Sequence, residues 1–242
     1  MKKIIIDCRM RKAEKDLLNS LGYELIELEK SKDVYEEISS HPDVFGVKIK
    51  DKLVLEPNTY NSLVPKILVE DILVIGNECV EATYPRDIKY NVCIVGKYAI
   101  HNYKYTDEII IKLLEEYGYE RIDVSQGYAN CSIAVIDDRS IITSDNGIYK
   151  KLKNLDLDIL FIEPDNIKLL NNGVYSMKKG FVGGCLTKLK LERNGKNVIF
   201  VSGDLNKLSC GKKIRDFIGD RNIDLIELPG LDVIDYGGMI EL

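Results

Sequence analysis

Short β-type runs and a helix-like segment follow one another in a fixed order along this chain. Residues 132–143 contain two apolar runs around a polar turn, which predicts a hairpin. A helix is predicted over 145–153, where Ile148 and Leu152 recur at helical spacing. The apolar run 159–162 then predicts a buried strand. The unit is therefore hairpin, helix, strand.

The same order recurs in three other parts of the sequence. Asn194-Gly195 is a strong turn signal in the last of them. The predicted hairpins cover 46–55, 91–100 and 186–201, the helices 60–64, 106–117 and 205–218, and the strands 72–75, 121–124 and 223–228.

The two ends of the chain together supply a fifth copy. Residues 231–242 contain a strand with no helix after it, and residues 1–30 contain a strand, a helix and another strand. The four internal copies begin near residues 46, 91, 132 and 186, a repeat of roughly 40 to 55 residues. Such a repeat is typical of radial and solenoid arrays.

We therefore expect an α/β fold, a five-fold pseudo-symmetric α/β propeller of ββαβ repeats in one domain, 1–242. Pairing of the N- and C-terminal segments would close the ring and remove its open strand edges. The alternative is a chance succession of the same elements in an α+β fold.

The composition excludes some classes of protein but does not indicate an activity. The net charge of −5 and evenly spread lysines do not predict a nucleic-acid partner. No apolar run is long enough to span a membrane, and the N-terminus reads as a strand, so we expect a cytoplasmic protein. The six cysteines form no Cys-x-x-Cys pair, which predicts free thiols and no metal site. No cofactor motif is present.

Residues that carry chemistry precede the predicted hairpins. His41 and Asp43 precede the first, Asp87 the second, Cys131 the third and Cys185 the fourth. Rotation about a common axis would bring these segments to one central cavity. Asp232 and Asp235, before the closing strand, would add carboxylates there. Several carboxylates suit a cationic ligand.

Two short motifs give the chain a family resemblance. Tyr84-Pro-Arg86-Asp87 is similar to an Arg-Asp motif, and Gly183-Gly184-Cys185-Leu-Thr187 is similar to a glycine-rich loop that precedes a nucleophilic cysteine. With the repeats, these motifs resemble the pentein superfamily of guanidino-group-modifying enzymes, such as arginine deiminases and amidinotransferases. The resemblance covers the whole chain at the level of the repeats.

The resemblance implies roles for particular residues. Asp87 would bind a substrate guanidinium, with Arg86 beside it, and Cys185 would attack the guanidinium carbon. The family's catalytic histidine would lie within 127–132, which holds no histidine, and Gly184 stands where many members have one. His41 is the replacement that we expect for that acid/base.

Each of these residues also has a structural interpretation. Cys185 could be a small buried side chain, and His41 could end a helix over 34–38. Cys131 and Cys185 could form a disulfide, take part in thiol chemistry, bind a soft metal with His41, or be unconnected. Asp235 could serve only to cap a turn.

Two functions therefore remain open. The first is a cysteine-dependent C–N hydrolase or amidinotransferase-like enzyme, with Cys185 and His41 catalytic and with Asp87, Arg86, Asp43, Cys131 and Asp235 binding a ligand such as an arginine derivative. The second is a non-catalytic ligand-binding or protein-interaction module.

Overall fold

A computed structural model describes residues 2–67, 72–170 and 179–242. The unit predicted from the sequence is present: an antiparallel hairpin, then a helix, then a strand parallel to the second strand of the hairpin. In the first three copies the three-stranded sheets are β3 (Gly46–Ile49), β4 (Lys52–Leu55) and β5 (Leu73–Ile75); β6 (Cys93–Val95), β7 (Tyr98–His101) and β8 (Glu120–Asp123); and β9 (Ile133–Val135), β10 (Ser140–Thr143) and β11 (Asp158–Phe161). Their helices are α3 (Pro57–Leu63), α4 (Glu108–Glu116) and α6 (Asn146–Leu152).

The fourth unit has a broken helix. Its sheet contains β13 (Leu186–Lys190), β14 (Asn197–Val201) and β15 (Asp224–Ile226). The sequence predicts one helix over 205–218, whereas the structure has a 3₁₀ turn, η3 (Leu205–Lys207), followed by α7 (Gly211–Gly219). The break coincides with a long-range contact: one oxygen of the Asp165 side chain accepts the backbone N–H of Cys210 at 2.9 Å and the hydroxyl of Ser209 at 2.7 Å.

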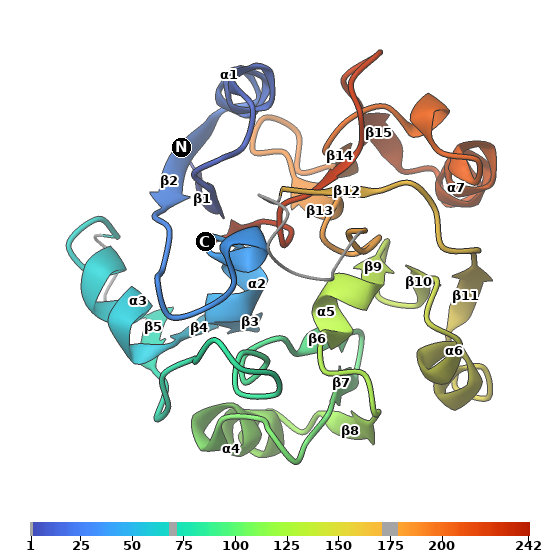
Figure 1. The fold of residues 1–242 in the computed structure, drawn as a ribbon. Helices are drawn as coiled ribbons and strands as arrows, with labels where there is room; N and C mark the ends of the chain where they lie inside the picture. Colours follow the sequence, from blue (N-terminus) through green and yellow to red (C-terminus); the bar gives the residue numbers. More distant parts are fainter. Residues whose placement is uncertain (1, 68–71, 171–178) are drawn as a thin grey trace.

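The chain ends pair as the sequence predicts. β17 (Ile240–Glu241) is antiparallel to β1 (Lys2–Asp7), and β1 is parallel to β2 (Tyr23–Leu28). Helix α1 (Lys12–Ser20) connects β1 to β2, so the fifth sheet repeats the strand order of the others. Figure 1 shows the five small sheets around a common centre, with α1, α3, α4, α6 and α7 on the outside.

The middle strands are apolar on both faces because each sheet packs against a neighbour on either side. In β1, Ile5 packs with residues of the first unit such as Val54, whereas Ile4 and Ile6 pack with Val198 of β14. Because both faces of these strands are buried, their sequences are continuous apolar runs and do not alternate between apolar and polar residues.

Short elements at the centre were not predicted. A 3₁₀ turn, η1 (Glu36–Ile38), leads to helix α2 (Pro42–Phe45), which enters β3, and helix α5 (Ala129–Ser132) enters β9. A two-stranded parallel pair, β12 (Lys168–Leu169) with β16 (Ile234–Asp235), lies before the closing strand. No helix in the described ranges is both long and apolar enough to cross a bilayer.

Candidate functional site

Asp43 lies at the centre of a buried hydrogen-bond network. Its Oδ2 accepts the thiol of Cys131 at 2.8 Å and the amide of Asn130 at 3.2 Å. The amide of Asn91 donates to the backbone oxygen of Asp43 at 3.1 Å and to Cys131 Sγ at 3.2 Å. Asp43 Oδ1 has no hydrogen-bond partner among the described residues. Burial raises the pKa of Asp43 to about 6, although these hydrogen bonds oppose the shift.

The segments before β3, β6, β9 and β17 fix this network. The carbonyl of Gly237 accepts the backbone N–H of Asp43 at 3.3 Å, and the side chain of Asn91 accepts the N–H of Asn130 at 2.8 Å. Gly237 has φ +68°, and a Cβ there would lie 2.7 Å from Asp43 Oδ1. The close approach of these loops therefore requires glycine at this position.

His41 is fully buried next to the network. Its Nε2 is 3.9 Å from Asp7 Oδ2 and its Nδ1 is 3.9 Å from Asp235 Oδ1, and neither nitrogen has a hydrogen-bond partner in the described ranges. Burial lowers the pKa of His41 despite the two carboxylates. One of them, Asp7, is already paired with Arg9. His41 follows the 3₁₀ turn η1, which covers only part of the predicted helix over 34–38, and it directly precedes helix α2.

Asp235 takes the space that a side chain at position 184 would need. Its Oδ2 accepts the N–H of Phe181 at 2.8 Å and its Oδ1 accepts the N–H of Gly237 at 2.8 Å. A Cβ on Gly184 would lie only 1.7 Å from Asp235 Oδ1. A histidine is therefore sterically excluded at position 184. Burial raises the pKa of Asp235.

Cys185 makes no hydrogen bond to Asp43, Asn91, Asn130 or Cys131 in the described part of the chain. It is buried in an apolar cluster with residues such as Ile199, and its thiol contacts the backbone oxygen of Val182 at 3.3 Å. Burial raises its pKa well above the ordinary value for a thiol, and the charge of Asp235 acts in the same direction. Cys131 is buried too, and its pKa is raised by burial and by Asp43. Both cysteines are free.

His41 and Cys185 do not contact each other through any hydrogen bond among the described residues. The charge of Asp235 raises the pKa of both groups and is the influence that they share. A nucleophilic cysteine needs a lowered pKa and a base within hydrogen-bonding distance. The structure gives Cys185 a raised pKa and a backbone carbonyl.

Asp87 forms a second acidic point with aromatic neighbours. It is completely buried, its Oδ2 accepts the hydroxyl of Tyr128, and its Oδ1 has no partner within the described residues. The ring of Tyr128 lies between those of Tyr84 and Phe181, at centroid distances of 6.0 and 6.2 Å. Burial raises the pKa of Asp87. Arg86 points away and pairs with Glu81 at 2.7 Å on the surface.

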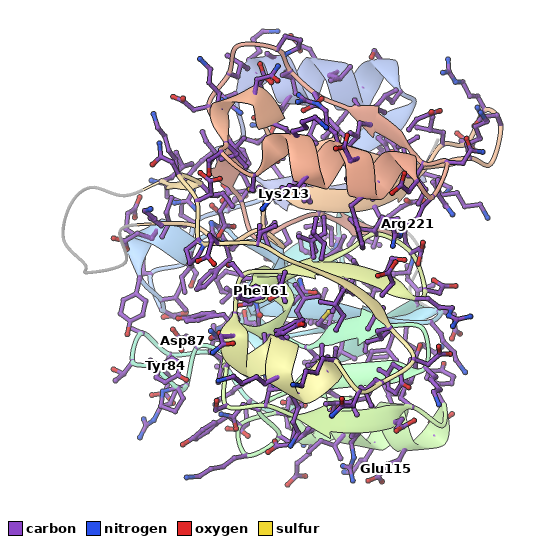
Figure 2. All side chains as sticks on the ribbon, turned by 90° about the vertical axis from the view of Figure 1, so that its right-hand side faces the viewer. Tyr84, Asp87, Glu115, Phe161, Lys213 and Arg221 are labelled. Atoms are coloured by element: carbon purple, nitrogen blue, oxygen red, sulfur yellow. The ribbon has the colours of Figure 1, made fainter. Side chains whose placement is uncertain are left out.

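Tyr84 is the exposed member of this group, whereas Asp87 is buried. Its side chain is 46% exposed, and Figure 2 shows Tyr84 and Asp87 close together at one edge of the molecule. We call Asp87, Tyr84, Tyr128 and Phe181 the Asp87 site.

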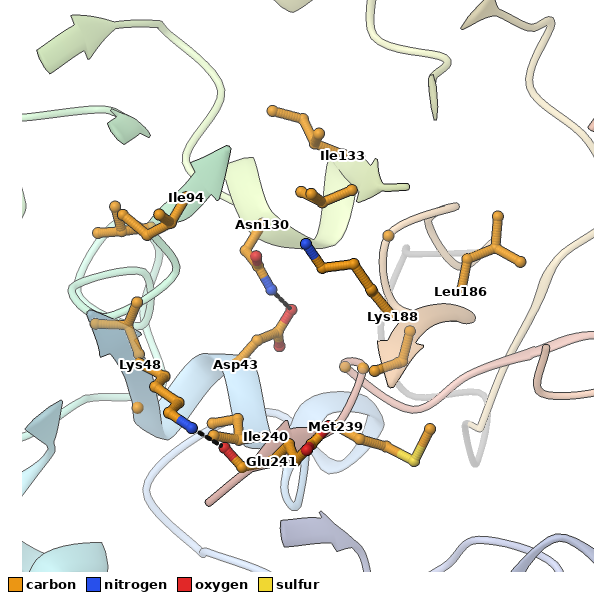
Figure 3. A pocket seen from close by; sticks show the side chains of 18 residues that line it. Asp43, Lys48, Ile94, Asn130, Ile133, Leu186, Lys188, Met239, Ile240 and Glu241 are labelled. Atoms are coloured by element: carbon orange, nitrogen blue, oxygen red, sulfur yellow. Dashed lines mark hydrogen bonds between the residues drawn. The ribbon is translucent and has the colours of Figure 1, made fainter. Parts of the chain in front are cut away.

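A cavity of about 330 Å³ lies among the first strands of the five sheets (Figure 3). Asp43 and Asn130 line it together with Lys48, Lys188 and Thr187. None of the residues of the Asp87 site lines it. We call it the channel cavity.

Sequence reasoning misses several contributors. The predicted site lacks Asn91, Asn130, Tyr128 and Asp7. A single amide, phenol or carboxylate side chain belongs to no recognisable sequence motif. One signal is present in the sequence: Asn91 begins a predicted hairpin, and Tyr128 and Asn130 lie just before another, as Asp43 and Cys185 do.

Comparisons with known proteins identify the fold. A family model described as "Family of unknown function (DUF6873)" matches residues 5–240. No curated protein matches the sequence.

Several solved structures are similar to the whole chain. DDAH from Pseudomonas aeruginosa, a cysteine-to-serine variant in complex with citrulline, has a TM-score of 0.59 and 10% identity, covering 100% of this chain and 99% of that one. Agmatine deiminase from C. jejuni gives 0.52 and 10%, covering 93% and 87%. The amidinotransferase SxtG from Microseira wollei gives 0.55 and 10%, covering 94% and 88%. These proteins are penteins, so the predicted resemblance is confirmed as a mixed α/β pentein fold. At these identities the likeness concerns the fold alone.

Proposed function

We propose that this chain, which belongs to the family of unknown function DUF6873, is a pentein that binds a small cationic ligand at Asp87. The observation that carries the proposal is the state of this carboxylate. It is completely buried, one oxygen lacks a hydrogen-bond partner, and no described lysine or arginine lies within ion-pair distance of it. A buried carboxylate is costly unless a cation or donors compensate it.

A guanidinium is the cation that fits this surrounding best. Its planar fork of N–H donors matches a carboxylate, and its face stacks on aromatic rings. Tyr128 holds one oxygen of Asp87 and leaves the other for the ligand. The rings of Tyr84 and Phe181 flank that of Tyr128, and such rings attract a cation held over their faces.

Asp235 acts in this proposal as a positioning residue. Its carboxylate holds the backbone N–H of Phe181 at 2.8 Å, and thereby fixes the loop that carries the aromatic ring. Arg86 has no part in the site, because it pairs with Glu81 on the surface.

Binding without hydrolysis accounts for the other residues better than the enzyme hypothesis does. Attack on a guanidinium carbon requires a thiolate and a proton-transfer group. The thiols of Cys185 and Cys131 both have raised pKa values, and His41 forms no hydrogen bond with either. We therefore favour the non-catalytic alternative over hydrolysis by Cys185 and His41.

We also propose that residues 1–242 form one domain and a closed five-fold α/β propeller. The pairing of β17 with β1 supports this arrangement, as does the placement of the sheets around one centre (Figure 1).

Calorimetric titration with matched ligands tests the proposed function. Arginine and agmatine should bind, and citrulline, which replaces the guanidinium by an uncharged group, should bind at least about tenfold more weakly. Asp87→Asn should weaken agmatine binding by a similar factor, whereas Arg86→Ala should leave it unchanged.

Two results would overturn the proposal. One is equal affinity for arginine and citrulline, because Asp87 would then not be recognising a charge. The other is release of ammonia or an amine from these compounds by the wild type, abolished by Cys185→Ser, which would establish the hydrolase hypothesis instead.

A further inference from the structure

The channel cavity is separate from the Asp87 site and has its own chemistry. It lies among β3, β6, β9, β13 and β17, and Figure 3 shows its lining side chains. Its volume of about 330 Å³ falls within the range of small-molecule sites. Nothing in the proposed function uses it.

The floor of the channel cavity is an acceptor site. Asp43 is 4% exposed and lines the cavity, and its Oδ1 has no partner within the described part of the chain. The amide nitrogen of Asn130 is used on Asp43 Oδ2, which leaves the carbonyl oxygen of the same side chain as a second acceptor. Both features suit a ligand with an N–H-rich cationic head.

The opposite end of the cavity carries positive charge. Lys48 donates to the main-chain oxygen of Glu241 at 2.6 Å, and Lys188 lies 3.3 Å from the highly exposed Asp138. Such an exposed ion pair is weak and is easily exchanged for another anion. The carboxylate of Glu241 is itself engaged by Lys2 and by the backbone N–H of Lys190.

An apolar wall connects the two ends. It is made by side chains of the first strands and the residues next to them: Val47, Val92, Ile94, Ile133, Val135 and Leu186. These side chains favour a hydrocarbon segment between the polar ends of a ligand.

The geometry points to a second binding site in the channel cavity, which takes a linear zwitterion with its ammonium on Asp43 and its carboxylate at Lys188. The two ends of the ligand are separated by a short methylene chain. Leu186 and Lys188 are two residues apart on β13, which places the backbone of Lys188 about 7 Å further along the channel than the start of that strand. An ω-amino acid of five or six carbons spans such a distance.

Titration with 6-aminohexanoate and two half-ligands tests this site. 6-Aminohexanoate should bind to the wild type, and both hexylamine and hexanoate should bind at least about tenfold more weakly, because each lacks one charged end. Asp43→Asn should weaken binding of 6-aminohexanoate at least tenfold. Lys188→Met should weaken it about three- to tenfold and should abolish the preference over hexylamine.

Control variants separate a lost contact from a lost fold. Lys196→Met removes an exposed lysine of the same hairpin and should leave binding unchanged. Thr187→Tyr places a larger side chain in the cavity with both charged ends intact, and should prevent binding while agmatine still binds at Asp87. That agmatine titration also shows that each variant is folded.

The outcomes distinguish this site from the Asp87 site. Equal affinity for hexylamine and 6-aminohexanoate, or no binding of either, would overturn the zwitterion site whatever agmatine does. Loss of 6-aminohexanoate binding in Asp87→Asn would also overturn it, since the two sites would then be one.

Discussion

Replacing Asp43 by asparagine should make the fold less sensitive to pH. Burial holds the pKa of this carboxyl at about 6 in the folded chain, compared with 3.8 for an ordinary aspartate. The folded state therefore binds a proton more tightly than the unfolded chain does. Stability from this group is complete below pH 3.8 and is lost as the pH rises through 6.

The size of the effect follows from the shift. About two pKa units correspond to roughly 3 kcal/mol lost by the wild type between pH 4 and pH 7. Asparagine has no charge to bury, but its amide would face Gly237 without an acceptor, which costs about 1–3 kcal/mol. We therefore expect the variant to be about as stable as the wild type or up to about 2 kcal/mol more stable at pH 7.5, and less stable at pH 4.

The assay is urea unfolding of both proteins at several pH values from 4 to 8. The useful quantity is the difference in unfolding free energy between them, since contributions of other titrating groups cancel. Asp16→Asn, on the exposed face of α1, is the matched control and should give a difference that changes little with pH. A difference for Asp43→Asn that is flat, or that moves in favour of the wild type as the pH rises, would refute the reasoning.

Two further predictions concern Gly184 and Cys185. Gly184→Ala should destabilise the protein by at least about 2 kcal/mol in thermal unfolding, because its Cβ would overlap Asp235, whereas Gly219→Ala, with open space around it, should be neutral or stabilising. A neutral Gly184→Ala would show that Asp235 moves freely. Iodoacetamide should label the exposed Cys79 in the native protein and Cys185 only after unfolding, so fast native labelling of Cys185 would contradict its burial.

The repeated units could be predicted because local physics specifies them. Apolar runs long enough to be buried on both faces, separated by turn residues such as Gly96 and Asn194-Gly195, leave few other structures for those segments. The same logic pairs the two chain ends, since each end holds the elements that the other lacks. The prediction of one continuous helix over 205–218 is wrong because the helix is interrupted where Asp165 contacts Cys210. This contact joins residues about 45 positions apart, and no local pattern in the sequence shows it.

The candidate site was only partly predictable, because its geometry depends on contacts between units. The register of the pre-hairpin segments brought Asp43 and Cys131 together, as the rotation argument expects. It could not show that Cys185, in the same register, is buried in an apolar cluster built from the third and fourth units. Nor could it reveal that two asparagines complete the network around Asp43.

Contacts between loops also explain why position 184 does not hold a histidine. Gly184 stands where many members of the resembled family have a histidine, and Asp235 occupies the volume that a side chain there would fill. Both oxygens of Asp235 accept backbone N–H groups, of Phe181 and of Gly237. Restoring a histidine at 184 alone would therefore require Asp235 to leave, and would release those two backbone donors. Asp235 therefore serves to fix the backbone of two loops, which agrees with the proposal that this protein binds a ligand without transferring protons.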